Sequence, residues 1–80
     1  MTQDREPDEH LDLRGVRCPA NSARALVRLE CMDAGQLLEI LVDDGEPIAH
    51  VPEALDEEGH RILVQERAEA AWRLLVEVGG

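Results

Sequence analysis

The chain has 80 residues, which is enough for one small domain that buries roughly 60% of its unfolded-chain surface and has no room for a large internal pocket. It carries 18 acidic residues against 8 arginines, without any lysine, and its formal net charge of −10 repels nucleic-acid backbones and anionic membrane surfaces. The absence of lysine excludes Schiff-base chemistry and P-loop phosphate binding, and a single aromatic residue, Trp72, leaves almost nothing for base stacking. Direct binding to nucleic acid or to a membrane is therefore not expected.

The first residues carry no targeting signal, and we expect the protein to be cytoplasmic. Residues 1–9 are polar and acidic without apolar periodicity, and no apolar run approaches about 20 residues. This pattern predicts a mobile acidic leader over residues 1–9, followed by a single domain over residues 10–80.

The segment from Leu11 to Pro19 predicts a strand, a tight turn and the start of a helix. Leu11 and Leu13 alternate with polar residues, as in a half-buried strand, and Gly15 permits the turn. Pro19 suits the first helical position, where its missing N–H costs nothing. Cys18 is then expected to be the N-cap residue.

A cysteine at a helix N-cap is a candidate nucleophile. Its sulfur faces unpaired N–H groups and the positive end of the helix dipole, and both favour the thiolate over the thiol. The stretch from Leu13 to Leu29 contains no acidic residue and four arginines: Arg14, Arg17, Arg24 and Arg28. These side chains are predicted to gather positive charge around the thiol, the alternative being that they only form the solvated face of a helix.

The remaining residues predict a helix, a strand, a second helix and a hairpin. The first helix is expected over residues 19–33 and the strand over residues 37–42, and Asp43 and Asp44 are expected to end that strand and to cap the helix over residues 47–58. Pro52 lies inside this second helix, which either kinks there or restarts. Strands are expected over residues 60–67 and 71–78. The apolar stripe of the first helix comprises Ser22, Ala25, Leu26, Leu29 and Met32, and Met32 and Trp72 are expected in the core.

The order βαβαββ predicts a fold of the α/β (α+β) class. Short αβ units followed by a hairpin favour a two-layer α/β sandwich, in which a mixed four-stranded sheet carries both helices on one face.

The other cysteine and the histidines offer no further site. Cys31 lies roughly 20 Å from Cys18, at the opposite end of the expected helix, so the two cannot form a disulfide within the chain and Cys31 is interpreted as incidental. His10, His50 and His60 show no metal-ligand spacing with each other or with the cysteines, and no metal site is expected.

The chain resembles the TusA/SirA-like sulfur carrier (sulfurtransferase) family. The resemblance spans residues 11–78 and rests on five short motifs: Leu11-Asp-Leu-Arg-Gly-x-Arg-Cys-Pro19, Gly35, Val42-Asp-Asp44, Val51-Pro52 and Gly59-His60. It implies the same βαβαββ sandwich and a sulfur atom carried as a persulfide on Cys18. One position differs, because the family motif Cys-Pro-x-Pro has Asn21 in place of its second proline. Asn21 brings an extra N–H group and a polar side chain close to the sulfur.

The leading hypothesis is a sulfur carrier that receives sulfane sulfur on Cys18 and needs no cofactor beyond the transient persulfide. Arg14, Arg17, Pro19, Asn21 and Arg24 are its candidate supporting or partner-binding residues. The resemblance implies a cysteine desulfurase or a rhodanese as donor and a downstream sulfur-relay protein as acceptor, in tRNA thiolation, molybdenum-cofactor synthesis or sulfur oxidation, with the protein itself a monomer. The alternative is a non-catalytic regulatory or interaction domain that keeps the fold. A thiol redox module is disfavoured because no resolving cysteine lies within reach of Cys18.

Overall fold

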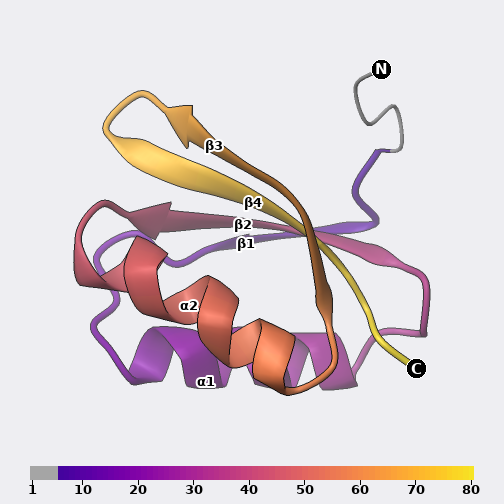
Figure 1. The fold of residues 1–80 in the computed structure, drawn as a ribbon. Coiled ribbons are helices and arrows are strands. Elements are labelled where there is room, and N and C mark those ends of the chain that lie inside the picture. The colour runs from indigo at the N-terminus through magenta and orange to yellow at the C-terminus, as the bar shows by residue number, and fades with distance from the viewer. Residues whose placement is uncertain (1–5) are drawn as a thin grey trace.

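The computed structural model describes residues 6–80, which form one layer of strands and one layer of helices (Figure 1). The elements, in chain order, are β1 (Glu9–Asp12), α1 (Ala20–Glu30), β2 (Leu37–Asp43), α2 (Glu46–Glu57), β3 (Arg61–Ala68) and β4 (Ala71–Glu77).

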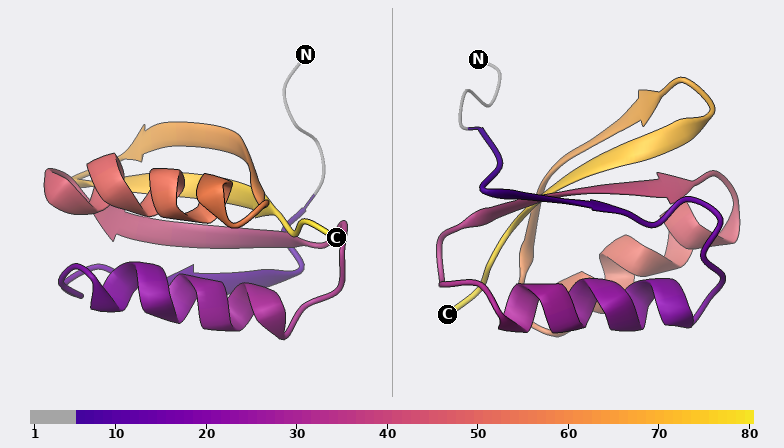
Figure 2. Two further views of the ribbon diagram at one scale, coloured as in Figure 1. Left: turned by 60° about the horizontal axis from the view of Figure 1, so that its bottom comes forward. Right: turned by 180° about the vertical axis from the view of Figure 1, so that it is seen from behind.

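The four strands form one mixed sheet in the order β1-β2-β4-β3. β1 and β2 are parallel and are joined through α1, whereas β4 pairs antiparallel with both β2 and β3. Both helices pack against the same face of the sheet (Figure 2). The predicted βαβαββ sandwich with a mixed four-stranded sheet is therefore confirmed.

The core lies between the sheet and the helices, and it follows the alternation of the strands. Leu38, Ile40 and Val42 of β2 are fully buried in this core together with Leu74 and Val76 of β4. The helices contribute Ala25, Leu29, Val51 and Leu55, and Met32 joins them as predicted. Trp72 is only partly buried against this core, and its indole N–H donates to Asp44.

The buried face of α1 begins one residue earlier than predicted. Asn21, rather than Ser22, is fully buried with Ala25 and Leu29, while Ser22 and Leu26 are half-buried. The spacing of apolar residues could not reveal this, since the first buried residue of the helix is polar.

Strand pairing begins before the domain boundary that the sequence predicts. The N–H of Asp8 donates to the Leu37 carbonyl (2.8 Å), its carboxylate accepts from the Leu37 N–H (2.8 Å), and Glu9 is the first residue of β1. The predicted leader over residues 1–9 is therefore wrong at its last two residues, because strand pairing requires backbone groups rather than apolar side chains. Residues 1–5 lie outside the described residues.

The second helix is continuous from Glu46 to Glu57 with Pro52 inside it, so it does not restart at the proline. Its N-cap residue is Gly45, and no side chain caps it. The predicted capping role of Asp43 and Asp44 is therefore wrong, because both carboxylates bind other partners. Neither helix within residues 6–80 has the length and apolar character needed to cross a membrane.

Candidate functional site

Cys18 lies in the turn between β1 and α1, at the end of the sheet where the parallel strands β1 and β2 both finish (Figure 1). Two hydrogen bonds fix this turn to β2: the Gly15 N–H donates to Asp43 Oδ2 (2.7 Å), and the Leu13 N–H donates to the Leu41 carbonyl (2.8 Å). Gly15 has a φ of +81°, which glycine adopts without strain, so the predicted tight turn is confirmed. The turn leaves Cys18 half-buried at the surface.

The helix starts one residue later than the sequence predicts. Pro19, rather than Cys18, is the N-cap residue of α1, and the peptide bond between them is cis. The N–H of Asn21 donates to the Arg17 carbonyl (3.0 Å), and across residues 6–80 no backbone N–H donates to the Cys18 sulfur. The predicted N-cap is therefore wrong. A proline lacks an N–H at either position, so the sequence could not distinguish an N-cap proline from a first-turn proline.

A side-chain amide contacts the sulfur instead. Asn21 Nδ2 donates to Cys18 Sγ (3.2 Å) and to the Val16 carbonyl (3.3 Å), and Asn21 Oδ1 accepts from the Ser22 N–H (2.7 Å). The polar group that the sequence places near the sulfur is thus in direct contact with it. Since Asn21 is completely buried, water does not compete with the sulfur for this amide.

An open pocket of about 490 Å³ lies beside Cys18. The end of β2 and the start of α2 supply its other wall, which carries three carboxylates: Asp43, Asp44 and Glu46. Arg17 is the one cationic residue in the lining. The sequence predicts a positively charged surrounding for the thiol, and the structure corrects this, because residues distant in the chain bring acidic groups to the same pocket.

The four arginines near Cys18 in the sequence lie in different places. Arg14 binds the Asp12 carboxylate through two hydrogen bonds (2.7 and 2.9 Å), which lower the pKa of Asp12 to about 2. Arg28 pairs with Glu9 (3.2 Å), and Arg24 lines a separate groove with Val27 beside β1. Only Arg17 reaches the pocket of Cys18.

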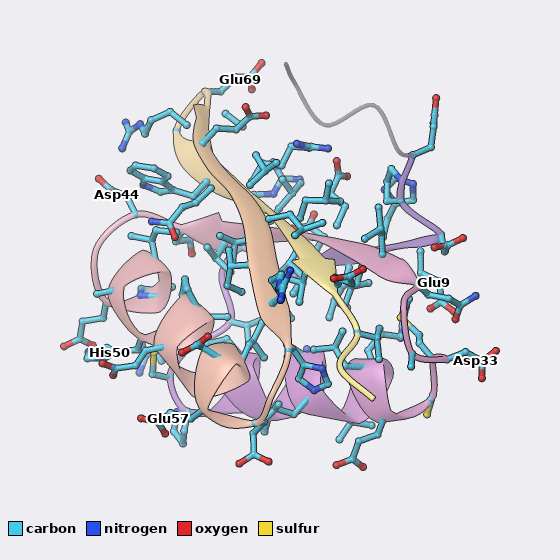
Figure 3. The ribbon with its side chains drawn as sticks, turned by 45° about the vertical axis from the view of Figure 1, so that its right-hand side comes forward. Glu9, Asp33, Asp44, His50, Glu57 and Glu69 are labelled. Atoms are coloured by element: carbon cyan, nitrogen blue, oxygen red, sulfur yellow. The ribbon has the colours of Figure 1, made fainter. Side chains whose placement is uncertain are left out.

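A second interaction, which the sequence analysis missed, holds the far wall of the pocket. The Trp72 Nε1–H donates to Asp44 Oδ1 (2.9 Å), and Arg67 approaches Asp44 Oδ2 (3.3 Å) with its guanidinium over the Trp72 ring (5.3 Å to the centroid). The indole hydrogen bond, the Gly45 N–H and Arg67 together lower the pKa of Asp44. Figure 3 shows Asp44 at the end of the molecule where α2 begins. The signal for this contact lies in the register that places Trp72 opposite Val42 on the neighbouring strand.

Within residues 6–80, the other side chains of the types that bind metal ions do not gather in one place. Cys31 is exposed at the C-cap of α1, beyond the full length of the helix from Cys18, and both cysteines are free. Figure 3 shows Asp33, two residues after Cys31, at the opposite end of the molecule from Asp44. Within residues 6–80 no three histidine, cysteine or acidic side chains come close enough together to hold a metal ion.

The family sequence model described as "Sulfurtransferase TusA" matches residues 9–78. The chain belongs to the TusA family. A protein of Archaeoglobus fulgidus is 33% identical over 73 residues, which cover 90% of this chain and 83% of the relative. A protein of Thermotoga maritima is 29% identical over 69 residues, which cover 85% of this chain and 87% of the relative. Both are named "Putative sulfur carrier protein".

Solved structures share the TusA-type fold of this chain. The crystal structure of a SirA-like protein from Desulfitobacterium hafniense superposes with a TM-score of 0.73 at 22% identity, covering 90% of this chain and 99% of that one. A solution structure of a Helicobacter pylori protein gives a TM-score of 0.66 at 19% identity, with coverage of 89% and 97%. These likenesses establish the fold, and the chemistry of this TusA-family member has to be argued from its own residues.

Proposed function

We propose that the protein is a sulfur carrier that holds sulfane sulfur as a persulfide on Cys18 and passes it to an acceptor. The observation that carries this proposal is the placement of Cys18: a half-buried thiol opens to a surface pocket and accepts a hydrogen bond from a buried amide. Membership in a family described as a sulfurtransferase, and relatives named as sulfur carriers, support the same chemistry.

Loading is a thiol displacement in which atoms and electrons balance. The Cys18 thiolate attacks the terminal sulfur of the donor's persulfide, the new sulfur–sulfur bond forms on Cys18, and the donor's cysteine leaves as a thiolate. The transferred sulfur keeps its proton or exchanges it with water. No external oxidant or reductant is consumed, so the scheme requires only the Cys18 thiolate and the donor's persulfide.

The proposal includes the partners that such a carrier needs. A cysteine desulfurase or a rhodanese is the class of donor, because each presents a protein persulfide, and a second sulfur-relay protein is the class of acceptor. We propose that the carrier works as a monomer, since an open pocket on a small domain lets each partner approach in turn, and that it does so in the cytoplasm.

Intact-mass measurement tests the proposal. The reduced protein is incubated with a cysteine desulfurase and cysteine, and we expect one added sulfur atom that disappears on treatment with a reducing thiol. Cys18→Ser should abolish the addition. Cys31→Ser is the matched control, because it removes an exposed thiol outside the pocket and should load normally.

Sulfur addition that depends on Cys31, or none in the unaltered protein, would overturn the proposal. The same variants address the alternative of a non-catalytic interaction domain, since such a domain keeps its biological activity when Cys18 is replaced by serine.

A further inference from the structure

Two hydrogen-bond partners fix the orientation of the Asn21 side-chain amide. The Val16 carbonyl can only accept a hydrogen bond and the Ser22 N–H can only donate one, so Nδ2 must lie toward Val16 and Oδ1 toward Ser22. The second hydrogen of Nδ2 then points at Cys18 Sγ, 3.2 Å away. The donor is therefore fixed on the sulfur rather than free to turn away.

This donor distinguishes the charge states of the sulfur. A hydrogen bond to an ionised acceptor is roughly twice as strong as one between neutral groups, and a thiol sulfur is a weak acceptor. An N–H aimed at Sγ therefore stabilises a thiolate more than a thiol, and more than the inner sulfur of a persulfide, whose charge lies mainly on its terminal atom.

The charge on Sγ changes most when the carrier gives up its cargo. An acceptor thiolate attacks the terminal sulfur of the Cys18 persulfide, the bond from the acceptor to that sulfur forms, and the bond to Sγ breaks with its electron pair remaining on Sγ. The terminal sulfur keeps its proton, and Cys18 departs as a thiolate. A leaving group whose thiolate is stabilised leaves faster.

We propose that Asn21 is a catalytic residue for sulfur release, whose buried amide N–H stabilises the negative charge that develops on Cys18 Sγ as the terminal sulfur departs. The inference rests on the proposed function and deepens it: the residue that replaces the second proline of the Cys-Pro-x-Pro motif poises Cys18 for donating sulfur rather than for retaining it.

Asn21→Leu tests this role because leucine keeps the branched skeleton of the asparagine side chain and removes the donor from a helix face that packs with Ala25 and Leu29. Release of persulfide sulfur to glutathione, followed by intact mass, should slow roughly threefold to tenfold, the effect of losing one hydrogen bond to a charged group. Asn21→Asp, which replaces the donor by a carboxylate, should slow release further if it folds. Ser22→Ala is the matched control on the neighbouring residue and should release at the original rate.

Alkylation of unloaded Cys18 by iodoacetamide gives a second readout that does not depend on sulfur loading. In Asn21→Leu the alkylation profile should move to higher pH, while its plateau at high pH should rise, because a less stabilised thiolate is more nucleophilic. A purely structural role, in which Asn21 only holds the turn through Val16, would change loading and release in the same direction and leave the pH position unaltered.

The two proposals fail in different ways. If Cys18 never accepts sulfur, the proposed function fails, while the alkylation profile still decides whether Asn21 stabilises the thiolate. If Cys18 loads normally but Asn21→Leu releases sulfur at the original rate with an unchanged alkylation profile, the role of Asn21 is overturned and the carrier function stands.

Discussion

The pocket of Cys18 is lined by three carboxylates and one arginine, and these groups differ in how firmly other residues hold them. Asp43 and Asp44 are held by the Gly15 N–H and the Trp72 indole respectively, so two of the three carboxylates in the acidic wall of the pocket are fixed in place. Arg17 lines the same pocket and makes no ion pair with any residue from 6 to 80. It is therefore the cation that remains available to an approaching anionic group.

We expect Arg17→Glu to slow sulfur loading from a cysteine desulfurase with an acidic surface roughly threefold to tenfold at low salt, because charge at an entrance steers encounter. The slowing should diminish as salt shortens the screening length to about 10 Å at 0.1 M. Stopped-time intact-mass assays at several salt concentrations measure both effects.

Arg24→Glu is the matched control for Arg17. It changes the net charge by the same amount, but its side chain lines the groove beside β1 rather than the pocket of Cys18. Equal slowing in both variants would show that total charge, rather than the position of Arg17, governs loading.

The sequence singles out the candidate nucleophile Cys18 and its neighbour Asn21 but not the rest of the pocket. The turn at Gly15 and the proximity of Asn21 to Cys18 follow from local spacing and local backbone preferences. The acidic wall does not, because it depends on the parallel alignment of β1 and β2, which brings residues 43–46 to the same end of the sheet as residue 18. Local charge counting therefore gives the wrong sign for the surroundings of the thiol.

Among the elements, α2 contains a proline in its interior, and the sequence does not show whether the helix continues past it. Pro52 lies at its seventh residue, where it cannot donate to the carbonyl of Ile48, whereas Pro47 lies in the first turn, where the N–H would have no partner within the helix. Burial of Val51 and Leu55 against the core keeps the helix continuous in spite of Pro52. Tertiary packing, which no local pattern shows, decides between a kinked and a restarted helix.

Pro52→Ala should therefore stabilise the protein by about 1–3 kcal/mol, since it restores one helical hydrogen bond and removes the clash of the proline ring. Urea unfolding followed by circular dichroism measures the change. Pro47→Ala is the matched control in the same helix and should not stabilise. A Pro52→Ala variant with an unaltered midpoint would mean that the neighbouring packing already compensates for the proline.

The fold class is predictable because the periodicity of apolar residues indicates which segments are strands and which are helices. Where each strand or helix begins and ends depends on the residues that it contacts. β1 begins at Glu9 rather than Leu11 because it pairs with β2, and α1 buries Asn21 because a polar network forms there. β3 contains an irregularity between Ile62 and Val64, which shifts its register against β4 and weakens any alternation in that strand. The departures in the strands arise from pairing between separate segments of the chain, whereas Asn21 is buried with hydrogen-bond partners no more than five residues away.

At the scale of the molecule, the sheet face opposite the helices carries a network of charged and polar side chains that joins all four strands. Arg73 of β4 donates to Glu39 of β2 and pairs with Glu66 of β3 (3.1 Å), and His10 of β1 contacts Glu39 (2.8 Å). Burial raises the pKa of Glu39, but the hydrogen bonds from Arg73 and His10 outweigh it, and the pKa is lowered below its ordinary value of 4.5. In a protein of net charge −10, this network offsets part of the repulsion among the carboxylates.

The pH dependence of stability follows from the lowered pKa of Glu39. A carboxyl group whose pKa is lower in the folded state contributes stability at pH values above its unfolded pKa, and this contribution is lost as the pH falls through the folded value. Arg73→Met should therefore cost about 1 kcal/mol at pH 7, where the Glu39–Arg73 pair is intact, and the cost should shrink as the pH falls from 4.5 through the lowered pKa of Glu39 in the folded protein. Urea unfolding of both proteins at pH 7 and at about pH 3 measures the two differences.

Arg61→Met is the matched control, because Arg61 is an exposed arginine of β3 that makes no ion pair with residues 6–80, and its effect should be near zero at both pH values. A cost of Arg73→Met that stays the same at both pH values would show that packing of the Arg73 side chain, rather than its charge, stabilises this face of the sheet.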